Sequence, residues 1–299
     1  MIETRDLTKT FDNFTAVDSL NLKIEKGEFF GLLGPNGAGK TTTISLLSTL
    51  LLPTKGEILI DGQQLTRQRP DLKRKISVIT QEYSMRQDMN MDEIMEYQGR
   101  LYFMPRKQIK ERTEELLEFC DLLKFRKRTV RKLSGGMKRK LMVCRALLTD
   151  PEILLLDEPT AGMDALSRRQ MWNLLRKLNE KNLTILLTTH YMEEAQSLCN
   201  RVALMDHGKL EEVSTPSALI ESLGAYAVDE MTADGTQNHY FHTRQEAIRY
   251  LEELTGQASL RETTLEDVFV ERAGKHLIDF KIADINRIRE VPCGGCEKS

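Results

Sequence analysis

The chain reads Gly34-Pro35-Asn36-Gly37-Ala38-Gly39-Lys40-Thr41 between a short apolar run, residues 29–33, and a stretch with helical spacing, residues 42–52. This octapeptide has the pattern G-x-x-x-x-G-K-[ST] in full, in the strand–loop–helix context that the pattern requires. Its glycines let backbone N–H groups converge on an anion, and the following helix N-terminus adds a favourable partial charge. We therefore predict a parallel α/β core with a phosphate-binding loop at a strand end.

The side chains of this loop have separate expected tasks. Lys40 would reach the β- and γ-phosphates of a nucleotide, and the Thr41 hydroxyl would bind Mg²⁺. An ordinary glycine turn before a helix would not need the full match. The predicted nucleotide contacts are Gly34, Pro35, Asn36, Gly37, Ala38, Gly39, Lys40, Thr41 and Thr42.

Two adjacent acids follow a second apolar run. Residues 153–156 are continuously apolar, as in a parallel strand buried on both faces, and Asp157 and Glu158 come next. Ligands of open α/β sheets sit outside such strand ends. Because neighbouring side chains of an extended segment point opposite ways, we expect two roles. Asp157 would join the Mg²⁺ shell and Glu158 would polarise the attacking water, whereas two solvated acids opening a loop are the alternative.

Two further polar residues follow apolar runs in the same way. Gln81 comes after residues 76–80, and His190 comes after residues 183–189. Taken alone, a histidine at a strand end is usually structural and a glutamine there is usually a surface residue. In the company of a phosphate loop and a carboxylate pair, we expect His190 to contact the γ-phosphate and Gln81 to contact Mg²⁺ or the water.

A second glycine pair occurs in Leu133-Ser134-Gly135-Gly136-Met137, just before a stretch with helical spacing. The first N–H groups of a helix are free to bind an anion. Basic residues in a first turn are locally unfavourable without an anion nearby, and Lys138, Arg139 and Lys140 stand there. The sequence thus indicates a second phosphate-binding device, remote from the first.

Composition narrows the class of protein. The 299 residues suggest about two domains. With 43 Lys and Arg against 45 Asp and Glu, the net charge of -2 argues against a general nucleic-acid binder. No apolar run approaches the roughly 20 residues of a membrane-spanning helix, and the N-terminus lacks the apolar core of a signal peptide. We expect a cytoplasmic protein that leaves any membrane crossing to another chain.

The cysteines give little indication of function. Cys120, Cys144 and Cys199 stand in apolar or helical contexts, where buried free thiols are expected. Cys293 and Cys296 form a single CxxC, which supplies two ligands where a structural zinc site needs four. This favours an unliganded tail, and a redox or metal role is the alternative.

Pattern changes along the chain predict its organisation. Residues 1–30 alternate as antiparallel strands do, and residues 91–150 have helical spacing with a break at Pro105. Thr215-Pro216 opens a short helix, and Thr243-Arg244-Gln245-Glu246 fits a capping box. We predict a nucleotide-binding P-loop domain over 1–220 with a helical subdomain at about 85–150. A small α+β appendage would cover 221–280, and a flexible tail 281–299.

Taken in order, these motifs resemble those of an ABC-type ATPase subunit. The resemblance covers about residues 1–215, with mild departures at Met137 and Met163, where glutamine and leucine are usual. It implies the fold class: a P-loop NTPase core with an antiparallel β subdomain and a helical insert. The segments that correspond to Walker A, Q-loop, signature, Walker B, D-loop and H-loop are 34–41, Gln81, 133–137, 153–158, 161–164 and His190.

The resemblance also implies partners and ligands. Ser134, Gly135, Gly136 and Asp164 would contact the ATP held by a second ATPase subunit, either an identical chain or a paralogue, with Mg²⁺ as the metal cofactor. Phe11 occupies the place of the aromatic residue that stacks on adenine, although Phe14 and plain core packing are alternatives. A separate transmembrane permease would dock on the helical insert beside Gln81.

The resemblance places the chain peripherally on the cytosolic face of the cell membrane. The segment 264–270 resembles an element of drug- and polysaccharide-exporter ATPases, although its spacing is also that of an amphipathic helix. Residues 124–140 hold nine basic residues and no acid, which suits either a solvated face or one near anionic lipid or the permease. A soluble ABC ATPase acting on ribosomes or nucleic acid is the alternative function. A kinase-type enzyme would leave 133–137 and His190 without a role.

Overall fold

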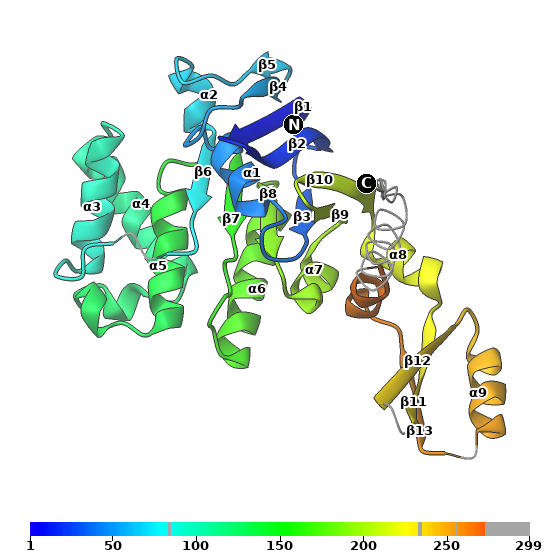
Figure 1. Cartoon of the computed structure of the whole chain (residues 1–299). Helices are drawn as coiled ribbons and strands as arrows, with labels where there is room; N and C mark the ends of the chain where they lie inside the picture. Colours follow the sequence, from blue (N-terminus) through cyan, green and yellow to red (C-terminus); the bar gives the residue numbers. More distant parts are fainter. Residues whose placement is uncertain (83–84, 233–234, 255, 273–299) are drawn as a thin grey trace, which may run out of the picture. The chain divides into compact units, whose positions relative to one another are not determined.

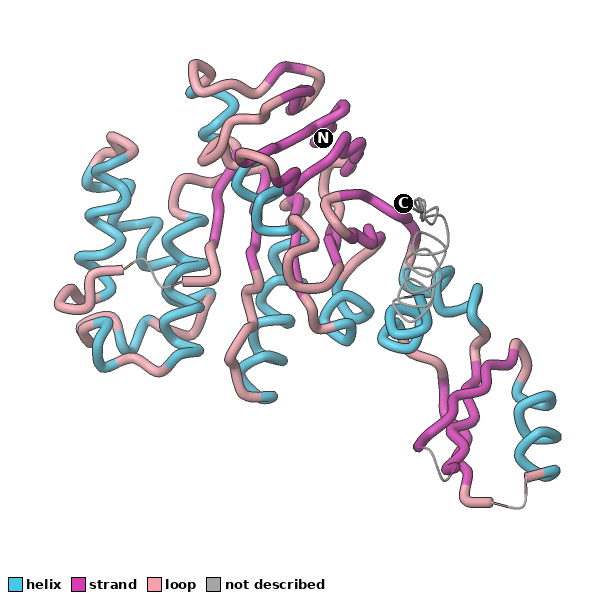
Figure 2. Tube along the Cα trace, in the orientation of Figure 1, coloured by secondary structure: helices cyan, strands magenta, loops and turns pink. Residues whose placement is uncertain are grey.

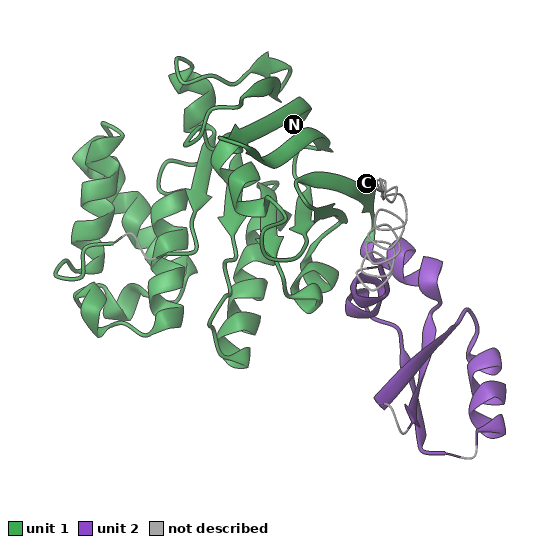
Figure 3. Ribbon diagram, in the orientation of Figure 1, with its two compact units in different colours: residues 1–215 green, residues 216–299 purple. Residues whose placement is uncertain are grey.

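The computed structural model describes residues 1–82, 85–232, 235–254 and 256–272. The chain divides into two compact units, 1–215 and 216–299 (Figure 3). The expected boundary at residue 220 falls inside helix α8 (Pro216–Leu223), and the two units divide just before this helix. The predicted tail, with Cys293 and Cys296, lies outside the described residues.

The centre of the first unit is a six-stranded sheet of order β10-β9-β3-β8-β7-β6 (Figure 1). Its strands are β3 (Phe29–Leu33), β6 (Ile76–Ile79), β7 (Ile153–Asp157), β8 (Thr184–Thr189), β9 (Arg201–Asp206) and β10 (Lys209–Ser214). The neighbouring pairs are parallel except β10 with β9. Every residue of β3, β7 and β8 is buried, which explains their continuous apolar runs. The predicted parallel α/β core is confirmed.

The register of the parallel strands aligns their carboxyl ends. Leu33 pairs with Thr189, Asp157 with Thr188, and Ile79 with Leu156. The residues that follow β3, β8, β7 and β6 therefore emerge along one edge of the sheet. Sequence segments more than a hundred residues apart meet there.

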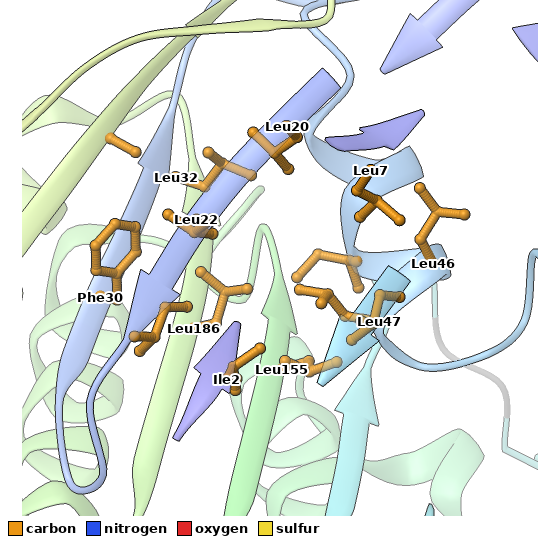
Figure 4. Close-up of a cluster of buried hydrophobic side chains, with 14 of the residues drawn as sticks. Ile2, Leu7, Leu20, Leu22, Phe30, Leu32, Leu46, Leu47, Leu155 and Leu186 are labelled. Atoms are coloured by element: carbon orange, nitrogen blue, oxygen red, sulfur yellow. The ribbon is translucent and has the colours of Figure 1, made fainter. Parts of the chain in front are cut away.

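A four-stranded antiparallel sheet of order β2-β1-β4-β5 packs on the same core. Its strands are β1 (Ile2–Phe11), β2 (Phe14–Ile24), β4 (Lys55–Ile60) and β5 (Gln63–Gln64). Leu7 and Leu20 from this sheet, Leu46 and Leu47 from helix α1 (Lys40–Leu47), and Leu155 from β7 join one buried cluster (Figure 4). Helix α1 is thereby fixed between the two sheets, with its first turn at the phosphate loop.

Helix α1 ends earlier than the sequence pattern predicts. The helical spacing runs to Leu52, but the helix stops at Leu47. Thr49 adopts a φ of +60°, a left-handed conformation that ends the helix before Pro53 is reached. The remaining helices of this unit are α2 (Pro70–Arg74), α6 (Ala165–Glu180) and α7 (Met192–Leu198).

Helices replace strands between β6 and β7 (Figure 2). They are α3 (Met91–Leu101), α4 (Arg106–Phe119) and α5 (Gly135–Leu147), with short 3-10 turns at Leu123–Phe125 and Val130–Lys132. Pro105 precedes α4 and interrupts the pattern where the sequence predicts a break. Across the described part of the chain, no helix combines the length and apolar character needed to cross a membrane.

The second unit holds a three-stranded sheet of order β12-β11-β13, made of β11 (Tyr226–Thr232), β12 (Gly235–Phe241) and β13 (Ala258–Glu262). Helix α9 (Arg244–Glu253) begins at Thr243 with the reciprocal side-chain bonds of a capping box, as predicted. A further helix occupies residues 265–272. The sequence does not signal β13, whose ASLRE lacks a clear alternation.

One arginine links strand β13 to the helix that follows it. Arg261 donates to both carboxylate oxygens of Asp267, at 2.7 and 2.8 Å, and to Asp229 on β11 at 2.8 Å. Burial by itself would raise the pKa of Asp267, but hydrogen bonds from Arg261 and Thr264 hold that pKa below its usual value. The bidentate geometry fixes the helix of residues 265–272 to the sheet.

We expect Arg261→Met to destabilise this unit by about 2 kcal/mol, because it leaves the charge of Asp267 without its bidentate partner. Amide exchange in β11 should then become about 30-fold faster by mass spectrometry of the full chain. The matched control is Arg249→Met, an exposed arginine on α9. Equal protection of β11 in both variants would contradict the link.

Candidate functional site

The phosphate loop connects β3 to α1. Gly39 stands at the N-cap of α1 with a φ of +100°, and a Cβ there would lie 2.3 Å from the Ala16 carbonyl oxygen. Only glycine fits both the conformation and the space. The loop therefore keeps its backbone N–H groups in the open curve that phosphate binding requires.

Lys40 is held inside this loop. Its Nζ donates to the carbonyl oxygens of Gly34 and Pro35, at 2.8 and 2.9 Å, and the residue is 6% exposed. Burial lowers the pKa of Lys40, and the charges of Glu158 and Asp157 oppose that shift. The lysine is thus poised to exchange two neutral carbonyls for a phosphate anion.

Asp157 closes strand β7 beside α1. Its Oδ1 accepts from the hydroxyl of Thr41 at 3.1 Å and from the hydroxyl of Thr188 at 2.6 Å. The carboxylate is buried, and these bonds replace the water that it lacks. The carboxylate of Asp157 and the hydroxyl of Thr41 therefore place two kinds of oxygen ligand next to the phosphate loop.

Glu158 has different neighbours from Asp157, as expected for adjacent acids. Its Oε1 lies 3.2 Å from Nδ1 of His190, and its Oε2 lies 3.4 Å from Nε2 of Gln81. Glu158 has a φ of +47°, an unfavourable conformation for a residue with a long side chain. Backbone strain of this kind persists where surrounding contacts enforce it, and it clusters at functional sites.

Lys40, Gln81, Glu158 and His190 line one cavity of about 580 Å³. Its lining also includes Asn36, Gly37, Gly39, Thr41 and Thr42 of the phosphate loop. The structure thus brings together the residues that the sequence places at separate strand ends. Polar groups converging in a cleft beside a phosphate loop are the usual mark of a nucleotide site.

The aromatic candidates stand at the tip of the β1–β2 hairpin, where Phe11 pairs with Phe14. Phe14 lines the cavity and is 63% exposed. Phe11 is 42% exposed with Nζ of Lys9 4.9 Å from its ring centroid, and it is not among the cavity's lining residues in the described chain. Exposure of both rings leaves stacking faces available.

Ser134 and Asp164 are helix caps. Ser134 Oγ accepts from the N–H of Met137 at 3.3 Å at the start of α5, and Asp164 accepts from the N–H of Ser167 at 2.9 Å at the start of α6. Hydrogen bonds from Ser167 lower the pKa of Asp164. A Cβ on Gly136 would lie 3.2 Å from Ser167 Oγ, so the two helix starts are neighbours.

The signature residues do not line the cavity of the phosphate loop. Ser134 and Gly136 line a different cavity, of about 510 Å³, together with Ser167 of α6. Within one chain, the candidate residues therefore form two groups. One group surrounds Lys40, and the other surrounds the N-terminus of α5.

The basic stretch of residues 124–140 is not a uniform solvated face. Arg126 and Lys127 both bind Asp92, each at 2.8 Å. Arg139 is 2% exposed and points into the protein, contrary to the expectation that it faces an anion at the start of α5. Its position explains the reversal, since Arg139 shares a helix face with the buried Met142, Val143 and Ala146.

Sequence reasoning missed Thr188 and Glu194. Thr188 lies directly opposite Asp157 in the β7–β8 register, a relation that only the strand pairing reveals. Glu194 is fully buried on α7, and its Oε1 accepts from Thr160 Oγ1 and Trp172 Nε1, each at 2.9 Å. A possible signal was its place between the apolar residues Met192 and Ala195.

Comparisons with known proteins agree with this geometry. Residues 17–161 match the family described as ABC transporter. The Nod factor export ATP-binding protein I of Cupriavidus metallidurans is 35% identical over 301 residues, covering 93% of this chain and 99% of that protein. The daunorubicin/doxorubicin resistance ATP-binding protein DrrA of Streptomyces peucetius is 39% identical over 224 residues, covering 75% and 68%.

Solved structures give the same result for the fold. The dimeric, post-hydrolysis ATP-binding cassette MJ0796 bound to ADP and Pi superposes with a TM-score of 0.65 at 28% identity. The match covers 72% of this chain and 98% of that one. Fold and site together define a P-loop ATPase. The chain belongs to the ABC transporter family, as an ATP-binding subunit that hydrolyses ATP to energise transport, and the resemblance read from the motifs is confirmed.

The buried Glu194 makes stability depend on pH. Burial raises the pKa of Glu194, and hydrogen bonds to its carboxylate oppose the shift without reversing it. Because the folded chain then holds the proton more tightly than the unfolded chain, stability falls as the pH rises above the ordinary glutamate range. We expect Glu194→Gln, which stays neutral, to gain thermal stability relative to the parent between pH 5 and pH 8.

Fluorescence of Trp172, the chain's one tryptophan and a direct partner of Glu194, reports this unfolding. The control is Glu193→Gln, an exposed neighbour on α7. A stability difference between parent and Glu194→Gln that stays constant with pH would contradict the assignment.

Proposed function

We propose that this chain hydrolyses ATP between two ATPase subunits and so drives an exporter in the cell membrane. The observation that carries the proposal is the separation of the candidate residues into two groups. Glu158, Gln81 and His190 meet at the phosphate loop, whereas Ser134 and Gly136 line another cavity. A second subunit that places its own Ser134 over this loop would complete the site.

Each residue at the loop has an assigned role. Lys40 leaves its carbonyl partners and binds the β- and γ-phosphates. Glu158 polarises the attacking water, and His190, 3.2 Å from Glu158, contacts the γ-phosphate and orients this carboxylate. Gln81, 3.4 Å from Glu158 on the other side, contacts the water or the metal.

The residues present fit a magnesium ion. Thr41 and Asp157 offer a hydroxyl and a carboxylate oxygen 3.1 Å apart, and Gln81 can add an amide oxygen. Mg²⁺ is usually bound through one or two carboxylates together with substrate phosphates. When bound, the ion would neutralise charge on the phosphates. Thr188 keeps Asp157 oriented toward Thr41 by its hydrogen bond of 2.6 Å.

An exposed phenylalanine of the β1–β2 hairpin is proposed to stack on the adenine base. The motif comparison favours Phe11, and the cavity lining favours Phe14. Both rings are exposed, and they lie opposite each other at the same hairpin tip. Either one can offer a π-face to a base without moving the phosphate loop.

The second subunit would supply Ser134, Gly135, Gly136 and Asp164. The N-terminus of α5 carries a positive partial charge, which suits the γ-phosphate of a partner's ATP. Related cassettes are dimeric in solved structures, which supports this arrangement. The partner would be a second copy of this chain or a paralogue.

The exporter assignment rests on the relatives. They are named for Nod factor export and for resistance to linearmycin and daunorubicin, and the first of them aligns with 93% of this chain. These names disfavour the soluble ribosome-type alternative, and the net charge of -2 disfavours nucleic acid as partner. The chain would work on the cytosolic face of the membrane, bound to a separate transmembrane permease.

The docking surface for that permease is proposed at a groove of about 470 Å³ between β6 and the end of α3. Leu101, Tyr102 and Phe103 border this groove and are exposed, with Phe103 at 88%. Exposed apolar side chains gathered beside a groove mark a protein interaction site. Gln81 lies two residues after β6 and lines the cavity of the phosphate loop, so a displacement of this surface would reach that cavity.

We expect Glu158→Gln to retain ATP binding, to lose at least about 100-fold in turnover and to accumulate an ATP-bound dimer. The amide keeps the shape of the side chain but accepts no proton from water. Phosphate release and size-exclusion chromatography with ATP measure the two effects. Retained turnover would refute the role of Glu158.

Ser134→Arg provides the complementary test of the second subunit's role. It should block dimer formation and hydrolysis while a single chain still binds ATP at Lys40. Loss of ATP binding by the monomer would count against a contact made across the dimer.

For the docking surface, Phe103→Asp should reduce co-purification of the proposed transmembrane permease by about 10-fold, because it places a charge in an apolar contact. The ATPase activity of the isolated chain should stay unchanged. Ile248→Asp, on the exposed face of α9, is the matched control. Undiminished permease recovery with Phe103→Asp would place the docking surface elsewhere.

A further inference from the structure

Arg139 is a buried cation that the roles above do not use. It lies on the second turn of α5, five residues after Ser134, and it heads the largest fully buried side chains of the described residues. Burying a guanidinium is costly unless the surrounding groups satisfy its donors. The acceptors of its hydrogen bonds therefore indicate its role.

The guanidinium holds backbone carbonyls on both sides of the site. Nε donates to the carbonyl of Pro159 at 2.6 Å, and Nη2 donates to the carbonyl of Glu158 at 2.7 Å. Nη1 donates to the carbonyls of Thr80 and Gln81, at 2.8 and 3.2 Å. One side chain of α5 thus grips the main chain at both Gln81 and Glu158.

We propose that Arg139 is a positioning residue that couples the start of α5 to the hydrolytic site of its own chain. When Ser134 engages the ATP of a second subunit, α5 takes up a defined place. The position of α5 then determines the position of Arg139, whose hydrogen bonds to the carbonyls of Gln81 and Glu158 hold these two residues in place. This inference rests on the proposed dimeric function and adds the path by which one site senses the other.

The chemistry of the side chain suits this task. Arginine presents five N–H donors in a rigid planar fork, and several carbonyls can be held at fixed angles at once. Hydrogen bonds from a charged donor in a buried site are short and strong. The bond to the Glu158 carbonyl also restrains a residue whose φ of +47° needs outside support.

The geometry of α5 makes the transfer direct. A helix rises about 1.5 Å per residue, so the five residues from Ser134 to Arg139 span about 7.5 Å along a stiff element. A displacement at the N-terminus of α5 therefore appears at Arg139 with little loss. Because Gln81 and Glu158 also contact each other at 3.4 Å, the hydrogen bonds of Arg139 position both residues that are proposed to contact the attacking water.

The test separates positioning from a merely structural role by splitting kcat from KM. Arg139→Met keeps the apolar stem and removes the four carbonyl bonds. We expect kcat for ATP to fall about 100-fold, as for a misplacement of about 1 Å, with KM nearly unchanged. With Glu158 still in place, the variant should accumulate an ATP-bound dimer by size-exclusion chromatography, because dimerisation persists and hydrolysis does not.

Arg139→Lys guards against a folding defect. It keeps the charge but only a compact point donor, so its kcat should lie between those of the parent and Arg139→Met, at a thermal midpoint close to the parent's. Arg176→Met is the matched control, since Arg176 also donates to a carbonyl, that of Ser197 at 3.2 Å on another part of the unit. Its kcat should equal that of the parent.

The measurements distinguish failure of the Arg139 coupling from failure of the dimeric function. Parental kcat in Arg139→Met, or a parallel loss of ATP binding and thermal stability in both Arg139 variants, would overturn the proposal. If Glu158→Gln dimerises with ATP while Arg139→Met turns over normally, the coupling fails and the dimeric function stands. If Glu158→Gln does not dimerise, the dimeric function itself fails.

Discussion

The site depends on the side-by-side alignment of four parallel strands. β3, β8 and β7 are buried along their whole length and β6 is partly buried, so their main-chain groups must pair with one another. That pairing sets the register, and the register brings the residues after each strand to one edge of the sheet. A slip of one residue would turn every side chain of a strand to the other face and carry Glu158 away from the phosphate loop.

A second layer of buried polar groups stands behind this edge. Thr188 orients Asp157, Glu194 joins Thr160 to Trp172, and Arg139 holds the carbonyls beside Gln81 and Glu158. Polar groups in such surroundings are costly when unpaired and rigidifying when paired. They give the loops around the phosphate site a stiffness that loops at a surface do not otherwise have.

Much of the site could be predicted because short local sequence motifs specify its functional groups. The phosphate loop, the acids after residues 153–156, the helix start after Ser134 and the capping box at Thr243 each follow from a few neighbouring residues. Sequence patterns predicted less where contacts with residues distant in the sequence determine the local structure. The left-handed Thr49 ends α1 early, and β13 forms although its own sequence gives no strand signal.

The sequence by itself determined the class of this protein, since the identity and order of its motifs specify a phosphate loop, a carboxylate-ended strand and a second glycine-rich helix start. Only the tertiary structure decided how these parts face one another. It showed that Phe14 lines the cavity, that Ser134 lines a separate one, and that Arg139 points inward. The physical reason is that a motif fixes which groups are present, whereas the direction of a side chain depends on what packs against it from elsewhere in the chain.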